Sequence, residues 1–404
     1  MNRLDHIIRF LFILILVGSS LLLSSTTLHS QLPGQSSFDE TGFVEYIAGN
    51  QPLIISVPHG GDLLPDSIPD RDCEGCIYVE DAFTQELSRD LAEAYNERTG
   101  CFPHIVINLL HRRKFDANRD LDTAADGNDV ATEAWGEYHR LIDSTKAVIA
   151  QEYGRGLFLD LHGHGHTVQR IELGYLLSGA ELRLTDAELN SEVFVAESSL
   201  RTLVGDSPSS LSHAELLRGP ESFGDLLVEK TYPAVPSSSD PAPLVGEEYF
   251  SGGYNTVRHG SRDNNGPIDG IQIECNQEVR FDEEMREVFV DSLTTVIIEY
   301  LDFHYGRVAC ELTSVDTKPV QQLFSLYPNP ASDYVYVQGK GTQTAIVIYN
   351  STGRQVNPPT FKEIQSEGEL YRINLDRLET GVYFVQYLDQ NTGRKFTEKL
   401  VILR

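Results

Sequence analysis

The middle of the chain alternates apolar, strand-like runs with helical patterns, and this alternation constrains the fold more than any other feature of the sequence. The runs "PLIISVPHG", "FPHIVINLLH", "GLFLDLHG" and "DGIQIEC" are typical of buried strands. The segments "EDAFTQELSRDLAEAYNERTG" and "ATEAWGEYHRLIDSTKAVIAQEYG" space apolar residues at helical intervals, and each ends in glycine. Alternating strands and helices predict an α/β domain whose sheet is mixed, mostly parallel and flanked by helices.

Four polar residues lie at or just after the ends of the predicted strands. They are His59, Arg112, His162 and Glu274. In open α/β sheets, ligands bind at the carboxyl ends of the strands. We therefore expect the functional site at that edge of the sheet.

The chain changes character in two places, once within this alternation and once after it. Its 404 residues are enough for two domains. Between about 205 and 250 it is rich in Ser, Pro and Gly, which predicts long loops that either cover the site or form a surface insertion. From residue 323, short alternating strands with turn residues between them predict a small all-β sandwich. The predicted domains are 38–308 and 323–404, joined by a linker at 309–322.

Residues 1–30 have the pattern of a secretory signal peptide. Arg3 and Arg9 precede the apolar run "FLFILILVGSSLLL", which small and polar residues follow. Because this run is long for a signal peptide, a retained anchor helix is the alternative. The formal net charge of −28 argues against nucleic acids and anionic membrane surfaces as partners and suits an exported, soluble chain.

The cysteine count is odd, so at least one thiol is unpaired within the chain. The five cysteines are Cys73, Cys76, Cys101, Cys275 and Cys310. In an oxidising compartment, "CEGC" predicts either a local disulfide or a bridge from one of its cysteines to Cys101, and the sequence leaves this choice open. Alternation along "IQIEC" places Cys275 on the apolar face of its strand, as a packed core thiol.

Two histidines after predicted strands suggest a metal site. In "DLHGHG", Asp160 and His162 point the same way because side chains in a strand alternate, so Asp160 can orient His162 or share the metal. His164 would share that face only if the strand continued, and the glycines favour a turn. In "SVPHGG", His59 follows another strand. A catalytic zinc commonly takes three ligands from His and Asp or Glu and keeps one position open.

The third ligand is predicted to be a carboxylate near the start of the first helical segment. Asp81 and Glu80 are the candidates, with Asp62 a further choice. A carboxylate at a helix start can also serve only as a helix cap. The sequence does not decide between Glu80 and Asp81.

Two further patterns predict groups that act on a substrate. In "HRRKFDANR", Arg112, Asn118 and Arg119 suit a substrate carboxylate or a developing oxyanion, and a surface salt-bridge network is the alternative. In "IQIEC", Glu274 points away from the apolar face at a strand end, where a carboxylate can act as general base toward a metal-bound water.

The central part resembles the N-formylglutamate amidohydrolase family. The resemblance rests on "SVPHGG", "EDAFTQELSRDLAE", "RRKFDANR", "LDLHGHGH" and "GIQIECNQEV", in this order and spacing. That family is similar in fold and site to zinc carboxypeptidases and aspartoacylases. The resemblance implies that His59, Asp81 and His162 bind zinc, and that Glu274 activates the zinc-bound water and then protonates the leaving amine.

The resemblance also implies how the substrate is held. Arg112 would polarise the scissile carbonyl, and Asn118 and Arg119 would bind the substrate's carboxylate. Family members commonly have serine where this chain has Gly163, and His164 is then expected behind the metal ligands or facing the substrate. This departure leaves a larger amide or a peptide possible as substrate.

The C-terminal part resembles the sorting domains of type IX secretion cargo. The blocks "YPNPASD", "YNSTGRQV", "LETGVYFVQY" and "KLVILR" follow one another in the expected order. This implies the type IX secretion machinery as a partner, and a secreted or cell-surface location.

Together these patterns predict a secreted zinc-dependent amidohydrolase that cleaves an amide bond in an N-acyl amino acid or a peptide. The alternative from another class is a non-catalytic surface protein that binds a carboxylate-bearing ligand through a degenerate site. A serine or cysteine hydrolase is a third possibility, although the chain lacks a G-x-S-x-G nucleophile motif.

Overall fold

The computed structural model describes residues 31–206, 210–306 and 310, then 324–327, 329, 331–339, 344–350, 354–356, 360–365, 368–389 and 395–402. The chain divides into two compact units, Met1–Leu312 and Thr313–Arg404. The predicted signal peptide lies outside the described residues, as does the predicted linker apart from residue 310. In the described part, no helix is both long and apolar enough to cross a membrane.

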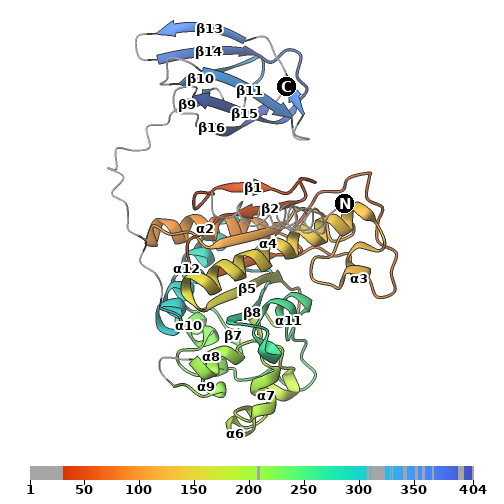
Figure 1. The fold of residues 1–404 in the computed structure, drawn as a ribbon, viewed down its shortest axis with the longest axis vertical. Coiled ribbons are helices and arrows are strands. Elements are labelled where there is room, and N and C mark those ends of the chain that lie inside the picture. The colour runs from red at the N-terminus through yellow and green to blue at the C-terminus, as the bar shows by residue number, and fades with distance from the viewer. Residues whose placement is uncertain are drawn as a thin grey trace, which may run out of the picture. The chain divides into compact units, whose positions relative to one another are not determined.

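One eight-stranded sheet forms the centre of the first unit (Figure 1). Its strand order is β1-β2-β4-β3-β5-β8-β6-β7. Its strands are β1 (Ser36–Phe38), β2 (Val44–Ile47), β3 (Leu53–Val57), β4 (His104–Asn108), β5 (Gly156–Gly163), β6 (Ile171–Gly174), β7 (Ala234–Val235) and β8 (Ile268–Cys275). The pairs β3–β4, β3–β5, β5–β8 and β6–β7 are parallel, whereas β1–β2, β2–β4 and β6–β8 are antiparallel. The carboxyl ends of β4, β3, β5 and β8 therefore lie at one edge of the sheet.

Helices cover both faces of this sheet. They are α2 (Thr84–Thr99), α3 (Leu121–Ala125), α4 (Asp129–Tyr153), α5 (Gly179–Leu182), α6 (Asp186–Leu189), α7 (Glu192–Glu197), α8 (Arg201–Asp206), α9 (His213–Arg218), α10 (Phe223–Glu229), α11 (Tyr254–His259) and α12 (Glu283–His304), with a 3₁₀ turn η2 (Arg262–Asn264). One apolar core joins α2, α10 and α12 to the sheet, and a second joins α4 to the opposite face. Alternate strand residues enter different cores: Leu53 and Ile55 pack with the first, and Ile54 with the second.

The two long helices next to the site end as their sequences predict. Gly100 after α2 and Gly154 after α4 adopt left-handed conformations, with φ of 71° and 78°. The start of α2 differs from the prediction, because Phe83 is left-handed and the helix begins only at Thr84. Asp81 therefore lies in the turn before the helix and does not cap it.

The prediction of long loops between about 205 and 250 is wrong for the first half of that segment. Two short helices, α9 and α10, form there, and Ser212 and Ser222 are their N-caps. Ser212 also forms a capping box with Glu215. The remaining part, from β7 to α11, is a long loop that reaches the functional site.

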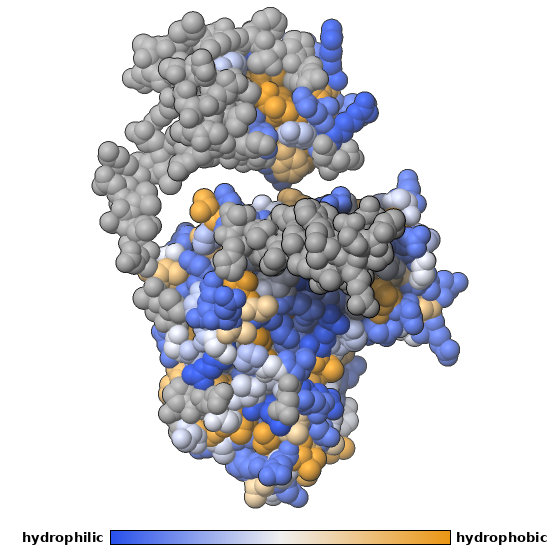
Figure 2. Space-filling view, viewed as in Figure 1, coloured by the Kyte–Doolittle hydropathy of each residue, from blue (hydrophilic) through white to orange (hydrophobic). Residues whose placement is uncertain are grey.

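The surface of the first unit is largely hydrophilic on the face seen in Figure 2, with scattered apolar patches. This agrees with the strongly acidic composition, a net charge of −28. Such a surface favours solubility.

The second unit consists of two four-stranded antiparallel sheets, β13-β14-β10-β9 and β12-β11-β15-β16. Its strands are β9 (Phe324–Tyr327), β10 (Tyr334–Gly339), β11 (Thr344–Asn350), β12 (Gln355–Val356), β13 (Thr360–Gln365), β14 (Gly368–Asn374), β15 (Gly381–Asp389) and β16 (Lys395–Ile402). Residues of both sheets, such as Val335 and Val385, share one buried core. The predicted fold class, a mixed and mostly parallel α/β sheet followed by an all-β part, is confirmed.

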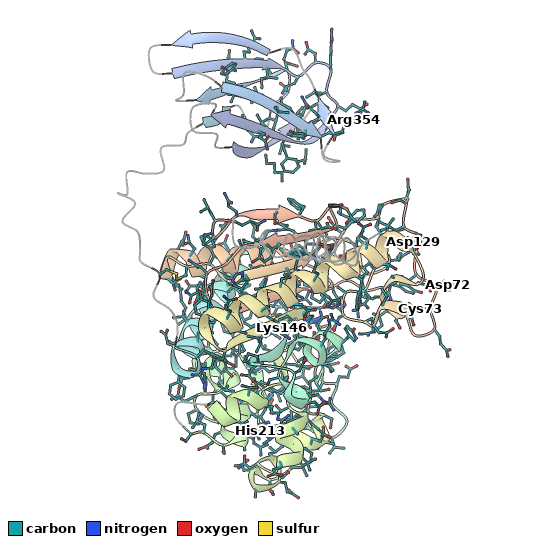
Figure 3. The ribbon with its side chains drawn as sticks, in the orientation of Figure 1. Asp72, Cys73, Asp129, Lys146, His213 and Arg354 are labelled. Carbon is teal, nitrogen blue, oxygen red and sulfur yellow. A yellow bond between two sulfur atoms is a disulfide. The ribbon has the colours of Figure 1, made fainter. Side chains whose placement is uncertain are left out.

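The cysteines form two disulfides, Cys73–Cys76 and Cys101–Cys310. Of the two pairings that the sequence left open for "CEGC", the structure has the local disulfide, Cys73–Cys76. It lies in the loop between β3 and α2, where Figure 3 labels Cys73. The second joins residues 209 positions apart. Cys275 is free and buried, and burial raises the pKa of its thiol to about 12, so it is a core thiol rather than a nucleophile.

Stability at acidic pH is expected to depend on His104 at the start of β4. Its Nδ1 accepts hydrogen bonds from the Tyr46 hydroxyl at 2.7 Å and the Gly49 amide at 3.1 Å, and burial lowers its pKa to about 4. In the unfolded chain the pKa of this histidine is about 6.5, so the unfolded chain binds the proton at a higher pH than the folded chain does. The stability that the neutral, buried His104 gives above pH 6.5 is therefore lost as pH falls toward 4.

As pH falls from 6.5 to 4, the free energy of unfolding of His104→Gln should therefore decrease less steeply than that of the wild-type chain. The two slopes should differ by up to about 1.4 kcal/mol per pH unit. Denaturant unfolding followed by the fluorescence of Trp135, the single tryptophan, measures this. A slope equal to that of the wild-type chain would contradict the prediction.

Candidate functional site

Three side chains converge at the carboxyl edge of the sheet: His59 after β3, Asp81 before α2 and His162 near the end of β5. Their ligand atoms all lie within 4.8 Å of one another, and all three residues are buried. The Asp81 Oδ2 atom lies 3.2 Å from Nδ1 of His59 and 3.0 Å from Nδ1 of His162. These three residues, called the triad below, form a group that could hold a metal ion.

The other ring nitrogen of each histidine is held by a second carboxylate. Nε2 of His59 lies 2.7 Å from Asp116 Oδ1, and Nε2 of His162 lies 2.9 Å from Asp160 Oδ2. A metal-ligating imidazole is neutral and has one N–H, which each histidine would donate to its second carboxylate, so that the Nδ1 lone pair faces the position beside the Asp81 carboxylate. A divalent cation between these atoms would satisfy them, and histidine ligands held by carboxylates are the usual arrangement around a bound metal. The residues of the triad therefore fit a metal ion.

The structure distinguishes between the candidate carboxylates. Asp81 belongs to the triad, and its backbone amide donates to the His59 carbonyl at 3.0 Å. The Glu80 carboxylate instead lies 3.3 Å from Nε2 of His111, and its side chain is 38% exposed. Asp62 is exposed and outside the triad.

The charges of the triad favour a cation. Burial alone would raise the pKa of Asp81, but His59 and His162 outweigh burial and lower it. Burial would lower the pKa of His162, but Asp160 and Asp81 raise it well above its usual range. The site thus holds ionised carboxylates that stabilise positive charge between them.

Glu274 lies beside the triad. It pairs in register with His162 across the parallel strands β5 and β8, and its Oε1 accepts a hydrogen bond from the Gln272 amide at 2.9 Å. Burial raises the pKa of Glu274 to about 8, with His162 opposing this shift and Asp81 adding to it. A divalent cation bound beside it would lower that pKa again.

The predicted substrate-binding residues follow β4 and lie in the same cavity. Arg112 donates from Nε to Asp116 Oδ2 at 2.9 Å, and its Nη1 lies 3.9 Å from Asp81 Oδ1. The Asn118 side chain is held in place because its Oδ1 accepts the Asn255 backbone amide at 2.7 Å, whereas its Nδ2, 3.3 Å from His162 Nε2, can still donate to a ligand. Arg119 is half-buried and hydrogen-bonds to the Asn118 carbonyl.

Sequence reasoning missed three residues that support the site. Asp116, within "HRRKFDANR", received no role from the sequence, yet it joins His59 to Arg112. Buried Arg71 donates twice to the Arg112 carbonyl, at 3.1 and 2.8 Å. Buried Arg280 reaches the carbonyls of Cys275, Ala82 and His164. The DANR motif contains Asp116, but no local pattern marks the two arginines.

Arg280 explains why glycine follows His162. A Cβ at Gly163 would lie 2.2 Å from the guanidinium carbon of Arg280. Serine at this position would push the guanidinium away from the carbonyls beside Asp81 and Glu274. Glycine at position 163 is therefore coupled to a buried arginine.

Gly163→Ser is accordingly expected to lower the free energy of unfolding by about 1–3 kcal/mol, because the buried guanidinium must leave its acceptors. The matched control is Gly136→Ala on α4, where a Cβ meets nothing within 4 Å, and which should be neutral or slightly stabilising. Denaturant unfolding of both variants measures the effect. Equal stabilities of the two variants would disprove this explanation of Gly163.

His164 and His166 lie near a second carboxylate, Glu172, and not at the triad. The ligand atoms of these three residues lie within 4.8 Å of one another. The Nε2 atom of His164 lies 2.8 Å from the Arg170 carbonyl, and its Nδ1 accepts the His166 backbone amide at 3.1 Å. His164 therefore supports the turn after β5.

The site lies in a cavity of about 420 Å³. This volume is within the range of about 300–1,000 Å³ typical of small-molecule sites. The predicted site residues line it, except Asp62 and Asp160, of which Asp160 is buried behind His162. Four large, exposed apolar side chains also line it: Ile77, Val79, Phe250 and Phe281.

Known proteins resemble the two parts of the chain separately. Residues 325–403 match the family model described as a secretion system C-terminal sorting domain. Beta-agarase A of Zobellia galactanivorans is 36% identical over 76 residues, which are 18% of this chain and 13% of that protein. The chain thus spans only about an eighth of the length of this curated relative.

Two solved structures are similar to parts of the chain. N-formylglutamate amidohydrolase from Ralstonia eutropha has 14% identity and a TM-score of 0.38, covering 66% of this chain and 97% of that chain. PorZ, a surface component of the type IX secretion system of Porphyromonas gingivalis, has 20% identity and a TM-score of 0.18, covering 22% of this chain and 13% of that chain.

The matching family model defines the class of the C-terminal part. It is a type IX sorting domain, as its sequence predicts. Such a domain addresses its protein to the type IX secretion machinery, so the protein is exported and reaches the cell surface or the medium.

Proposed function

We propose that the protein is a secreted, zinc-dependent amidohydrolase that cleaves an amide bond in a carboxylate-bearing substrate, either an N-acyl amino acid or a peptide. The observation that carries this proposal is the triad, in which two histidines turn Nδ1 toward one carboxylate while Asp116 and Asp160 hold their other nitrogens. Zinc held there by His59, Asp81 and His162 would lower the pKa of a water molecule and polarise the substrate carbonyl.

Glu274 is the general base in this proposal. Its carboxylate, at the end of β8 beside His162, takes the proton of the attacking water and then returns it to the leaving amine. Burial removes competing solvent from around this carboxylate, which strengthens its interaction with charges that develop nearby.

Three residues after β4 hold the substrate. The Arg112 guanidinium, fixed by Asp116, stabilises negative charge that develops on the carbonyl oxygen. Asn118 and Arg119 bind the substrate's carboxylate, with Arg119 as the cation that faces the cavity.

The test is metal analysis combined with hydrolysis assays on N-acyl amino acids and on dipeptides. One bound zinc per chain, and activity that disappears on chelation and returns with zinc, would support the proposal. Activity that survives complete removal of metal would overturn it. Binding of carboxylate ligands without any turnover would favour the alternative, a non-catalytic binding protein.

A further inference from the structure

The third histidine of "HGHGH", His166, is held in a fixed orientation within the cavity. Its Nδ1 lies 2.9 Å from Oε1 of Glu172, and the other carboxylate oxygen of Glu172 accepts the Phe250 backbone amide at 2.8 Å. Glu172 is fully buried, whereas the His166 side chain is 12% exposed. Its ring also packs against Phe250, with centroids 4.5 Å apart. These contacts fix the plane of the imidazole.

The opposite ring nitrogen of His166 is available to a ligand. Glu172 can only accept a hydrogen bond when ionised, so it takes the Nδ1 proton and directs Nε2 to the other side of the ring. Among the described residues, no protein atom hydrogen-bonds to this Nε2. Because His166 lines the cavity, a bound substrate is the natural partner.

A second metal ion is a poor fit for this cluster. His164 donates from Nε2 to the Arg170 carbonyl and accepts at Nδ1 from the His166 amide, so it has no lone pair left for a metal. Only His166 and Glu172 would remain as ligands. The cluster is better suited to binding a polar group of an organic substrate.

The sheet order places His166 and the arginines on opposite sides of the reacting centre. Arg112 and Arg119 follow β4, His59 follows β3, and His162 lies near the end of β5. Glu274 lies near the end of β8, and Glu172 lies on β6 directly opposite Glu274. A substrate whose carboxylate is held by the arginines would therefore extend its other part, beyond the scissile amide, toward His166 and Phe250.

We propose that His166, oriented by Glu172, determines substrate specificity by hydrogen-bonding the acyl part of the substrate through Nε2. This inference rests on the proposed function and narrows it. The preferred substrate is a peptide, whose acyl part carries amide or amine groups next to the scissile bond, rather than an N-formyl or N-acetyl amino acid. Phe250 supplies an apolar surface for the adjoining side chain.

The test compares two substrates that share one C-terminal amino acid, its N-acetyl derivative and a dipeptide. In His166→Ala, kcat/KM for the dipeptide should fall about tenfold or more, while that for the N-acetyl derivative changes much less. Glu172→Gln should also lower kcat/KM for the dipeptide relative to the N-acetyl derivative. His166→Gln should recover part of the dipeptide kcat/KM that is lost in His166→Ala. Val168→Ala, an exposed neighbour outside the cavity lining, is the matched control.

Binding measurements make the test independent of turnover. Calorimetric titration of the dipeptide into zinc-loaded Glu274→Gln should show weaker binding when His166→Ala is added, with metal content unchanged. If the wild-type chain hydrolysed neither substrate, dipeptide binding that depends on His166 would support the inference and overturn the proposed function. Three outcomes would overturn the inference. His166→Ala could lower kcat/KM equally for both substrates, the dipeptide could bind equally well with and without His166, or His166→Ala could lose its metal.

Discussion

Glu274→Gln is expected to lower kcat by about three to four orders of magnitude while metal content stays at the wild-type level. The amide keeps the shape of the carboxylate and can still accept the hydrogen bond from Gln272, but it cannot take a proton. General-base catalysis of this kind contributes about 10²–10⁴ in rate, and Glu274 also returns the proton to the leaving amine. Steady-state kinetics on a hydrolysed amide, with metal analysis of the same preparation, measures both quantities.

The interpretation depends on a fold that is unchanged in the variant. Circular dichroism and the denaturation midpoint of Glu274→Gln should match those of the wild-type chain. Activity within tenfold of wild type would remove Glu274 from the mechanism. Loss of metal together with activity would indicate that Glu274 acts as a ligand.

His162→Ala is expected to abolish stoichiometric metal binding, whereas His166→Ala is expected to retain it. His162 directs Nδ1 into the triad, while His166 lies with Glu172 in a separate cluster. Removal of one of three protein ligands leaves two, which is too few for a tightly held zinc. Metal content after dialysis, measured by elemental analysis, distinguishes the two variants.

The carboxylate behind His162 provides a graded version of this test. Asp160→Asn should weaken metal affinity about 10- to 100-fold without abolishing binding, because it changes the orientation and basicity of His162 but removes no ligand. If His166→Ala alone emptied the site, the assignment of His162 would be wrong.

Much of the α/β fold could be predicted from sequence because its signals are local. The apolar runs that became β3, β4, β5 and β8 each carry their own pattern, and glycines mark the ends of α2 and α4. The segment around 205–250 was mispredicted for a related reason. Serine is common both in loops and at helix N-caps, and only the following residues and the tertiary contacts distinguish the two.

The candidate metal site was predictable in part. Histidines after strands indicated His59 and His162, but the choice between Glu80 and Asp81 depends on where the turn before α2 points each carboxylate. That direction is set by the left-handed Phe83 and by the hydrogen bond from the Asp81 amide to the His59 carbonyl. Neither the left-handed conformation of Phe83 nor this hydrogen bond has a signature in the local sequence.

The sequence by itself determined the alternation of strands and helices, the set of polar residues at the strand ends and the C-terminal sorting domain. Only the tertiary structure decided which of these residues meet. It separated His162 from His164 and His166, placed Glu172 opposite Glu274, and paired Cys101 with Cys310. The reason is physical: periodicity is a property of neighbouring residues, whereas strand order and turn direction follow from packing across the whole sheet.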